Sequence, residues 1–406
     1  MPSDVVELEN DLRNFVVYFE FLQLPIGRIF DRRSVLEGAR SIDRSRAKAA
    51  VGHDIVLEGD EIKANECLMR AKTAELDHAF QHPEDFLPAQ NFLRARKEIE
   101  QSTVFRILRR MPKGGLFHAH GLAILSVDKL LRYTHLPNLW ISRSGFAFLF
   151  SRARPPPLLS HSCDDWVPIE ERRRAEPNLD QEIKRHLMLS SSRNDDINHV
   201  WKDFNKLFPA VVQAMEGRIS GPDHRFRSGR PGGHASLVAG LQGGARGHQD
   251  ETNFFFHAGE TNWYGRQPDH NLYDAIVLNT KRIGHGFALI KHPKLMEIVK
   301  EKKIVVEVSP ISNQVLKLVG DMRNHPAAHF FATNLPVVIT SDDPSLWGAK
   351  GLSYDFYEAD LRALKQLALN SIKYSSLDKH EKLKAFKISS RHGWNSSRNC
   401  SRVRCV

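Results

Sequence analysis

Four short apolar runs constrain the fold of this chain more than any other feature, because each run ends abruptly in polar residues. The runs cover residues 254–260, 281–286, 304–310 and 336–344. Helical patterns lie between them, for example at residues 293–300 and 324–332. Strands that alternate with helices imply a parallel sheet, and barrels of this kind carry their functional groups at the carboxyl ends of the strands. We therefore predict an α/β fold, specifically a (β/α)8 TIM-type barrel.

A histidine pair lies upstream of these runs, in a fifth apolar stretch at residues 116–120. His118 and His120 are two positions apart, and on a strand such side chains point to the same side. Taken alone the pair is weak support for a metal site, because buried and surface histidines are common. His257 adds a third imidazole and Asp342 a carboxylate, and three nitrogens with one oxygen suit zinc. We predict one Zn²⁺ per subunit, bound by these four residues.

Three further polar residues at the strand ends are candidates for catalysis. The run at residues 254–260 begins with three phenylalanines, which we expect to form a short buried strand that delivers Glu260 at its end. A carboxylate three residues beyond a metal ligand is well placed for proton transfer. His285 lies between two glycines, which leaves space around the imidazole, although a simple turn explains it equally well when it is taken alone. Asp343 precedes Pro344 and could instead cap a helix.

The composition divides the chain into five parts. We predict an N-terminal helical segment at 1–100, the first barrel strand and helix at 101–135, an inserted surface module at 136–195, the remainder of the barrel at 196–388 and an irregular tail at 389–406. Within the barrel, residues 217–250 are rich in glycine and arginine, and we expect them to be poorly structured. Residues 1–100 have two interpretations. They could form a solvated helical collar without a specific function, or a segment that mediates dimerisation.

The length, composition and net charge of the chain exclude some classes of protein. The chain has 406 residues, 41% of them hydrophobic, which is enough for a large core. Its net charge of +10 is not accompanied by any nucleic-acid-binding motif, so we expect no nucleic-acid partner. No apolar run is long enough to span a membrane, and the N-terminus lacks the layout of a signal peptide. Taken as complete, such a chain would be cytoplasmic.

The motifs together resemble the adenosine deaminase family of the amidohydrolase barrels, and in particular its secreted branch, the adenosine deaminase-related growth factors. The resemblance is carried by MPKGGLFHAHG (111–121), FFFHAGETNWYG (254–265), LNTKRIGHGFALIKHP (278–293), EVSPISNQVLKLVGDMRNHP (307–326) and ITSDDPSLWGAKGLSYDFYEADL (339–361).

The resemblance implies an activity and a role for each site residue. Adenosine, and 2′-deoxyadenosine, would be hydrolysed to inosine and ammonia at the zinc site. Glu260 would donate a proton to N1 of the purine, while His285 and Asp343 would orient and activate the water that attacks C6. Asp343 would also contact N7, and we assign Gly259 and Trp263 to substrate binding with it. The resemblance further implies secretion and a homodimer formed through the N-terminal helices.

The chain departs from the family in several places. Gly121 stands where the branch has a substrate-binding aspartate, and residues 217–250 lack the strand that contacts the purine. Cys163 has no partner cysteine nearby, and a glycine-rich turn is missing between Glu358 and Ala359. After the insert too little chain remains for strands two to four, since a strand–helix unit takes roughly 30 residues. We predict an internal deletion and a barrel that is incomplete around those strands.

Two alternatives to the deaminase hypothesis follow from these departures. One is a catalytically impaired or inactive relative that acts as a binding or growth-factor-like protein. The other is an amidohydrolase that acts on a different aminopurine nucleoside, because the missing strand is the one that selects the substrate.

Overall fold

The computed structural model of the chain describes residues 32–120, 123–143, 145–155, 166–189, 196–215, 254–357 and 361–392. The predicted poorly structured segment at 217–250 lies outside these residues, as do Gly121, Cys163 and the Glu358–Ala359 junction. Within the described part, no helix is both long enough and apolar enough to cross a membrane.

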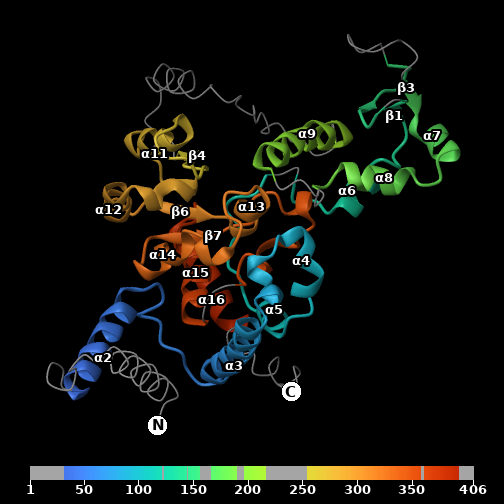
Figure 1. The fold of residues 1–406 in the computed structure, drawn as a ribbon. Coiled ribbons are helices and arrows are strands. Elements are labelled where there is room, and N and C mark those ends of the chain that lie inside the picture. Colours follow the sequence, from blue (N-terminus) through green and yellow to red (C-terminus); the bar gives the residue numbers. More distant parts are fainter. Residues whose placement is uncertain are drawn as a thin grey trace.

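A four-stranded parallel sheet organises the second half of the chain. Its strands are β4 (Phe255–Ala258), β5 (Arg282–His285), β6 (Val305–Val308) and β7 (Val337–Ile339), in the order β4-β5-β6-β7. The connections carry α11 (Gln267–Val277), α12 (Pro293–Glu301), α13 (Pro310–Val315) and α14 (Ala327–Ala332), as Figure 1 shows. The predicted alternation of strands and helices is therefore confirmed.

The central strands are apolar because both of their faces are covered. Every residue of β6 and β7 is buried, as expected for parallel strands with helices packed against them. Ile283, Val306 and Val337 form one core with the inner faces of the surrounding helices. This packing fixes the carboxyl ends of β5, β6 and β7, where the polar residues follow.

The sheet does not close into a barrel among the residues that the structure describes. The stretch at 116–120, predicted as the first barrel strand, pairs through a single parallel bridge between Ala119 and Asp342, just beyond β7. Thus β4 lies at one edge of the sheet and the bridge at Ala119 at the other. This open arrangement agrees with the predicted incomplete barrel.

The prediction of a buried strand at residues 254–256 was wrong. The side chain of Phe255 is 42% exposed, and Phe256 is only half-buried. The reason is position: β4 pairs only with β5 among the described strands, so its outer edge has no neighbour. The three consecutive aromatic residues predicted a strand correctly. They did not indicate that one edge of this strand would lack a neighbouring strand among the described residues.

The N-terminal part is helical and packs below the sheet. It comprises α2 (Arg32–Ala49), α3 (Asp60–Gln81), α4 (Phe92–Ile99) and α5 (Thr103–Leu108). The pattern at 92–108 suggests one continuous helix, but the structure has two, because Ser102 caps α5 by accepting a hydrogen bond from the N–H of Phe105 at 3.1 Å.

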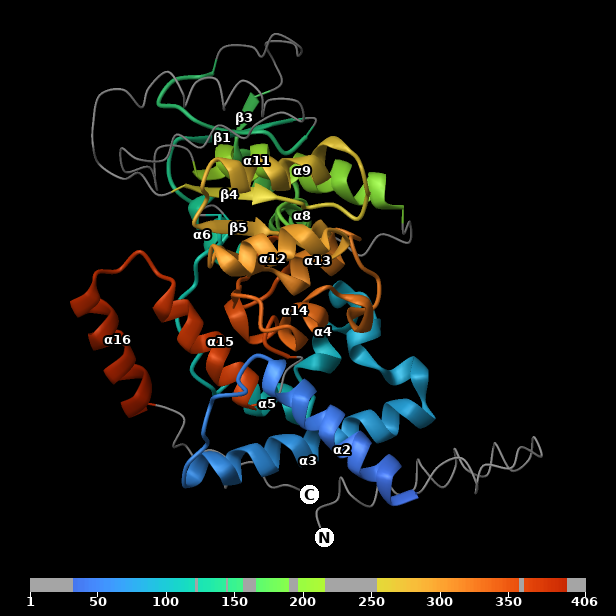
Figure 2. The same ribbon diagram turned by 90° about the vertical axis from the view of Figure 1, so that its left-hand side faces the viewer.

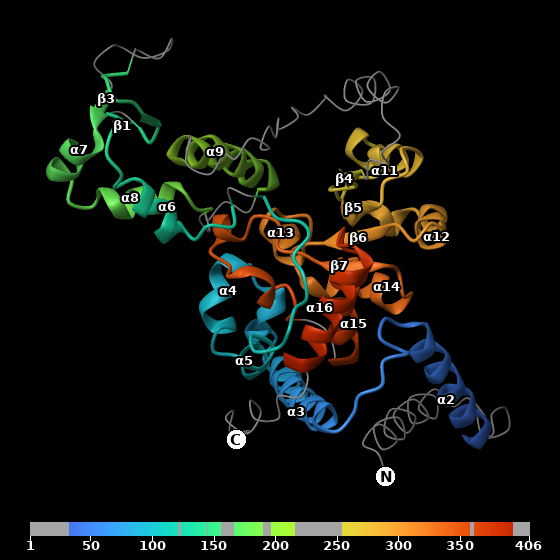
Figure 3. The same ribbon diagram turned by 180° about the vertical axis from the view of Figure 1, so that it is seen from behind.

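A separate small sheet lies away from the parallel one (Figure 3). It is antiparallel, with β1 (Leu139–Ser142) between β2 (Phe148–Phe150) and β3 (Trp166–Pro168). The helices around it are α6 (Val127–Tyr133), α7 (Ile169–Ala175), α8 (Leu179–His186) and α9 (Ile197–Met215). These elements fall largely within the stretch predicted as an inserted module.

The C-terminal helices are α15 (Leu361–Lys373) and α16 (Lys379–His392), and α16 lies outside α15 (Figure 2). The helix α16 ends at His392, so the first residues of the predicted irregular tail are helical. Short 3₁₀ helices complete the described part: η2 (Pro83–Asp85), η3 (Leu87–Ala89), η4 (Phe287–Lys291), η5 (Met322–Asn324), η6 (Pro344–Trp347) and η7 (Gly351–Ser353).

Candidate metal centre and active site

The structure brings together the four residues predicted as metal ligands. One nitrogen from each of His118, His120 and His257 and one carboxylate oxygen of Asp342 lie within 4.8 Å of one another. The Oδ1 atom of Asp342 is 3.2 Å from Nε2 of His118 and 3.1 Å from Nε2 of His120. The four residues come from the stretch before α6, from β4 and from the residues after β7, so only the fold makes them neighbours.

Backbone geometry explains how these side chains reach one point. Gly284 in β5 faces the imidazole of His118, and a Cβ atom at Gly284 would lie 2.9 Å from Cε1 of His118. Only glycine leaves room for that ring. Asp342 and His285 both adopt left-handed backbone conformations, with φ of 55° and 64°. Such conformations cost of order 1–3 kcal/mol in residues with side chains and cluster at functional sites.

The donor set fits a cation. Nε2 of His118 and Oδ1 of Asp342 are buried and make no hydrogen bond within the described structure, although they lie close together. Buried polar atoms without partners are costly, and an ion between them would satisfy both. Burial by itself lowers the pKa of His118, but the carboxylates of Asp342 and Glu307 raise it to about 10. The site therefore favours positive charge.

A second layer of charge lies behind His118. Oε2 of Glu307 is 3.2 Å from Nδ1 of His118, and Oε1 of Glu307 is 2.7 Å from Nε of Arg282. The guanidinium of Arg282 in turn lies over the rings of Phe255 and Phe117, 3.8 and 4.4 Å from their centroids. Sequence reasoning gave Glu307 and Arg282 no role. The available signal was a charged residue inside the valine run of β6, where burial demands a partner.

The three predicted catalytic residues lie beside the metal group. Oε1 of Glu260 is 3.5 Å from Nε2 of His285, and both residues can share a cation with Asp342. Burial and the nearby Asp342 carboxylate raise the pKa of Glu260 to about 8, so it is largely protonated at neutral pH. The same two causes raise the pKa of Asp343 to about 8. Burial holds the pKa of His285 well below its usual range, which makes this imidazole neutral.

The alternative role of Asp343 as a helix cap receives no support from its side chain. Asp343 precedes η6, but its carboxylate makes no capping hydrogen bond, and its buried Oδ1 has no hydrogen-bond partner within the described structure. The neighbouring Asp342 is held by Ser312, whose Oγ donates to Oδ2 of Asp342 at 2.7 Å. Asp342 is thus anchored by Ser312, whereas Asp343 has a buried oxygen without a hydrogen-bond partner in the described structure.

The backbone groups of Gly259, a residue predicted to contact the substrate, make hydrogen bonds within the protein. The N–H of Gly259 donates to Oδ1 of Asn271 at 2.8 Å, and its carbonyl accepts from the N–H of Ala288 at 2.9 Å. With φ of 65°, Gly259 packs against Leu272 where a Cβ atom would clash. Its polar groups are used to turn the chain after β4. Trp263, on the same loop, is 66% exposed and open to solvent.

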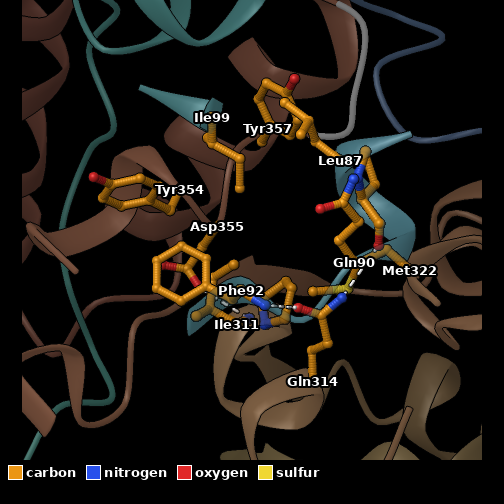
Figure 4. A pocket seen from close by; sticks show the side chains of 12 residues that line it. Leu87, Gln90, Phe92, Ile99, Ile311, Gln314, Met322, Tyr354, Asp355 and Tyr357 are labelled. Carbon is orange, nitrogen blue, oxygen red and sulfur yellow. Dashed lines mark hydrogen bonds between the residues drawn. The ribbon is translucent and has the colours of Figure 1, made fainter. Parts of the chain in front are cut away.

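A small pocket lies beside Ile311 and Gln314 of α13 (Figure 4). Its volume is about 20 Å³, which is room for one water and far below the several hundred Å³ of a typical ligand site. The walls are Leu87, Pro88, Gln90, Phe92, Ile99, Pro310, Ile311, Gln314, Met322, Tyr354, Asp355 and Tyr357. Asp355 is a buried acid there, and the pocket is not a nucleoside site.

Three histidines, an aspartate and a nearby glutamate grouped at the carboxyl edge of a parallel sheet are the arrangement typical of metal-dependent hydrolases of the barrel type. The adenosine deaminase model matches residues 242–388, and the model of the adenosine/AMP deaminase N-terminal region matches residues 41–108. The chain belongs to the adenosine deaminase family, in the branch of the adenosine deaminase-related growth factors.

Curated relatives cover most of the chain. Adenosine deaminase of Aedes albopictus is 32% identical, over 92% of this chain and 89% of its own length. Adenosine deaminase 2 of Homo sapiens is 35% identical, over 86% of this chain and 92% of its own length. The Aedes alignment extends over 488 residues, which is 82 more than the 406 residues of the chain, so at least that many residues of the relative lack a counterpart. This agrees with the predicted internal deletion.

Solved structures are more distant. The apo N6-methyl-AMP deaminase of Arabidopsis thaliana has a TM-score of 0.45 at 15% identity, and the match covers 71% of this chain and 98% of that one. A zinc-bound amidohydrolase from a Burkholderia species has a TM-score of 0.40 at 16% identity, with 74% and 95% covered. The family assignment therefore rests on the sequence comparisons.

Proposed function

We propose that this protein is a zinc-dependent hydrolase that converts adenosine, and 2′-deoxyadenosine, to inosine and ammonia. The observation that carries the proposal is the convergence of His118, His120, His257 and Asp342, with Glu260 and His285 directly beside them. Three imidazole nitrogens and one carboxylate oxygen match the ligands that zinc prefers. When bound, zinc supplies a water whose pKa is lowered towards about 7.

The residues around the metal group have separate roles in proton donation, in holding the water and in contacting the nucleoside. Glu260, protonated at neutral pH by its raised pKa, donates a proton to N1 of the purine. His285 and Asp343 hold the water that attacks C6, and ammonia then leaves. The exposed ring of Trp263, three residues after Glu260 in the chain, offers an aromatic surface to the nucleoside.

The open sheet favours a second candidate function, that of an inactive relative which binds a partner or ligand without turnover. His257 is exposed and lies on the edge strand β4, which has no outer neighbour among the described strands. An incompletely enclosed site admits water and loosens the ligand geometry, and both effects reduce catalysis. A change of substrate to another aminopurine nucleoside is the third possibility, because the purine-contacting strand was not found in the sequence.

One experiment separates these functions. Purified protein loaded with zinc is incubated with adenosine, and the loss of absorbance at the adenine band is followed, with 2′-deoxyadenosine and other aminopurine nucleosides in parallel. Turnover of adenosine that is lost in a Glu260→Gln variant supports the proposal. Stoichiometric zinc without turnover of any nucleoside supports the inactive relative, and turnover of another nucleoside alone supports the third function.

We also propose secretion and a homodimer, both from the branch to which the chain belongs. For the dimer, α3 carries large exposed apolar side chains at Ile62, Met69, Leu76 and Phe80. Light scattering on the wild type and on a Leu76→Glu/Phe80→Glu variant tests the dimer, since a dimer of this kind becomes a monomer in the variant. Fractionation of cells that express the full transcript tests secretion.

A further inference from the structure

We propose that His325 and Asn313 are positioning residues that hold His285 as the tautomer with its proton on Nε2. The three side chains form one hydrogen-bonded row that begins at a backbone N–H group. They come from different elements: His325 precedes α14, Asn313 lies in α13 and His285 ends β5.

The row begins at an atom whose role is fixed. The backbone N–H of Ala327 donates to Nδ1 of His325 at 3.0 Å. A backbone nitrogen can only donate, so Nδ1 of His325 carries no proton. The proton of this neutral imidazole is therefore on Nε2, which lies 3.0 Å from Oδ1 of Asn313 and donates to it.

That donation orients the amide of Asn313. Its oxygen is used by His325, so the atom that lies 3.5 Å from Nδ1 of His285 is the amide nitrogen, Nδ2. An amide nitrogen can only donate, and Nδ1 of His285 must accept. The proton of His285 is consequently on Nε2. Each assignment follows from the one before it, starting from the backbone of Ala327.

Burial makes the row persistent. His325, Asn313 and His285 are all buried, with exposed fractions of 4%, 0% and 2%. Water cannot readily replace a partner in such a position, and a reversed amide would set donor against donor and acceptor against acceptor. The ring of Phe287 packs edge-on against His325, with centroids 5.4 Å apart, and limits its rotation.

The tautomer decides what His285 presents to the site. Nε2 is the atom 3.5 Å from Glu260, so a proton there points a donor towards the space beside the metal group. The next step rests on the proposed function. The Nε2–H of His285 donates to the oxygen of the attacking water and holds that water towards C6. With the opposite tautomer a lone pair would face that oxygen, and the orientation would be lost.

Nitrogen NMR of the protein with ¹⁵N-labelled histidine rings tests the tautomer without any need for activity. A His285→Asn variant assigns the ring signals. We expect wild-type His285 to have an unprotonated Nδ1 and a protonated Nε2. In Asn313→Asp the new carboxylate accepts from both rings, and we expect Nδ1 of His285 to become protonated. In His325→Gln the side chain can still donate to Asn313, and we expect the wild-type pattern.

Kinetics provide the second readout when adenosine is a substrate. In serine proteases a wrong histidine tautomer lowers kcat by about 10⁴. We expect Asn313→Asp to lower kcat at least about 100-fold with KM nearly unchanged, and His325→Gln to stay within about tenfold of wild type. A His325→Leu variant, which donates nothing, should resemble Asn313→Asp.

The outcomes distinguish failure of this inference from failure of the proposed function. Two results overturn the proposed tautomer control, whether or not the enzyme turns over adenosine. One is a wild-type His285 that is protonated on Nδ1, and the other is an unchanged protonation of His285 in folded Asn313→Asp. Absence of turnover in the wild type with the expected NMR pattern overturns the deaminase function only. Thermal unfolding of each variant verifies that the comparison is made between folded proteins.

Discussion

Glu307 contacts His118, a proposed metal ligand, from the side that faces away from Asp342. Its contact with Nδ1 of His118 leaves Nε2 free to face Asp342 and the metal position. Partners of this kind fix the ring and typically change metal affinity 10–100-fold. We predict that Glu307→Leu weakens zinc binding by about that factor, measured by competition with a chromophoric chelator.

Glu61→Leu is the matched control for this prediction. It also removes a buried carboxylate from an ion pair, with Nζ of Lys365 at 2.7 Å, but Glu61 lies in α3, which contributes no atom to the metal group. Zinc affinity should stay at the wild-type value in Glu61→Leu. Equal weakening in both variants would show that the effect is general destabilisation.

Asp355 offers a second test at the scale of one residue, because burial raises its pKa well above the usual range. The native side chain therefore keeps its proton to a higher pH than the unfolded chain, which releases it above about pH 4. Stability therefore falls as pH rises above that value. Asn is neutral, and its Oδ1 can still accept from the N–H of Ile311 as Asp355 does at 3.3 Å.

We predict that Asp355→Asn raises the free energy of unfolding at pH 8 and that the gain shrinks towards pH 4. Denaturant unfolding at several pH values measures the difference. A gain that is the same at pH 4 and pH 8 would contradict the assignment of a neutral acid at this position.

The start of α14 shows how a helix end can depend on pH. His325 accepts a hydrogen bond from the N–H of Ala327 in the first turn, and burial lowers the pKa of His325 from 6.5 to about 3. The native imidazole stays neutral, while the unfolded chain takes up a proton below about pH 6.5. Stability is therefore lost as pH falls from 6.5 towards 3, at up to about 1.4 kcal/mol per unit.

We predict that this acid-induced loss is smaller in His325→Gln, which cannot take up a proton in this range. The measurement is the slope of unfolding free energy against pH between 6.5 and 4.5 for the two proteins. Parallel slopes would mean that His325 does not contribute to the pH dependence.

At the scale of elements, the sequence was informative wherever the pattern is local. The polar endings of the runs at 281–286, 304–310 and 336–344 predicted β5, β6 and β7 and the edge at which they end. The exposure of Phe255 could not be predicted, because it depends on whether another strand lies beside β4. Local pattern defines a strand, but neighbours distant in sequence define its burial.

The same reasoning applies to the site. The grouping of His118, His120, His257 and Asp342 could be predicted because strand ends converge in a parallel sheet. The partners Glu307, Arg282 and Asn313 could not, because their roles depend on side-chain distances of a few ångströms between elements. For Gly259 the motif predicts a substrate contact, but it gave no sign of the hydrogen bonds to Asn271 and Ala288 that turn the chain.

For the whole molecule, an ion bound by His118, His120, His257 and Asp342 would cross-link distant parts of the chain. His118 and His120 precede α6, His257 belongs to β4, and Asp342 follows β7. In a closed barrel the neighbouring strands would also hold these segments together. In this open sheet, β4 pairs only with β5 among the described strands, so a bound ion would have a larger share in keeping His257 near the other three residues.

We therefore predict that removal of the metal lowers the stability of the whole protein. A ligand present at 100 times its Kd stabilises the folded state by about 2.7 kcal/mol, which for a large domain corresponds to roughly 5 °C in Tm. Chelation of zinc should lower the Tm of the wild type by about that amount, and readdition of zinc should restore it. The His118→Ala/His120→Ala variant should unfold at the same temperature with and without chelator. If its Tm fell as far as that of the wild type, the stabilising ion would have to bind elsewhere, and the four-residue metal centre would be refuted.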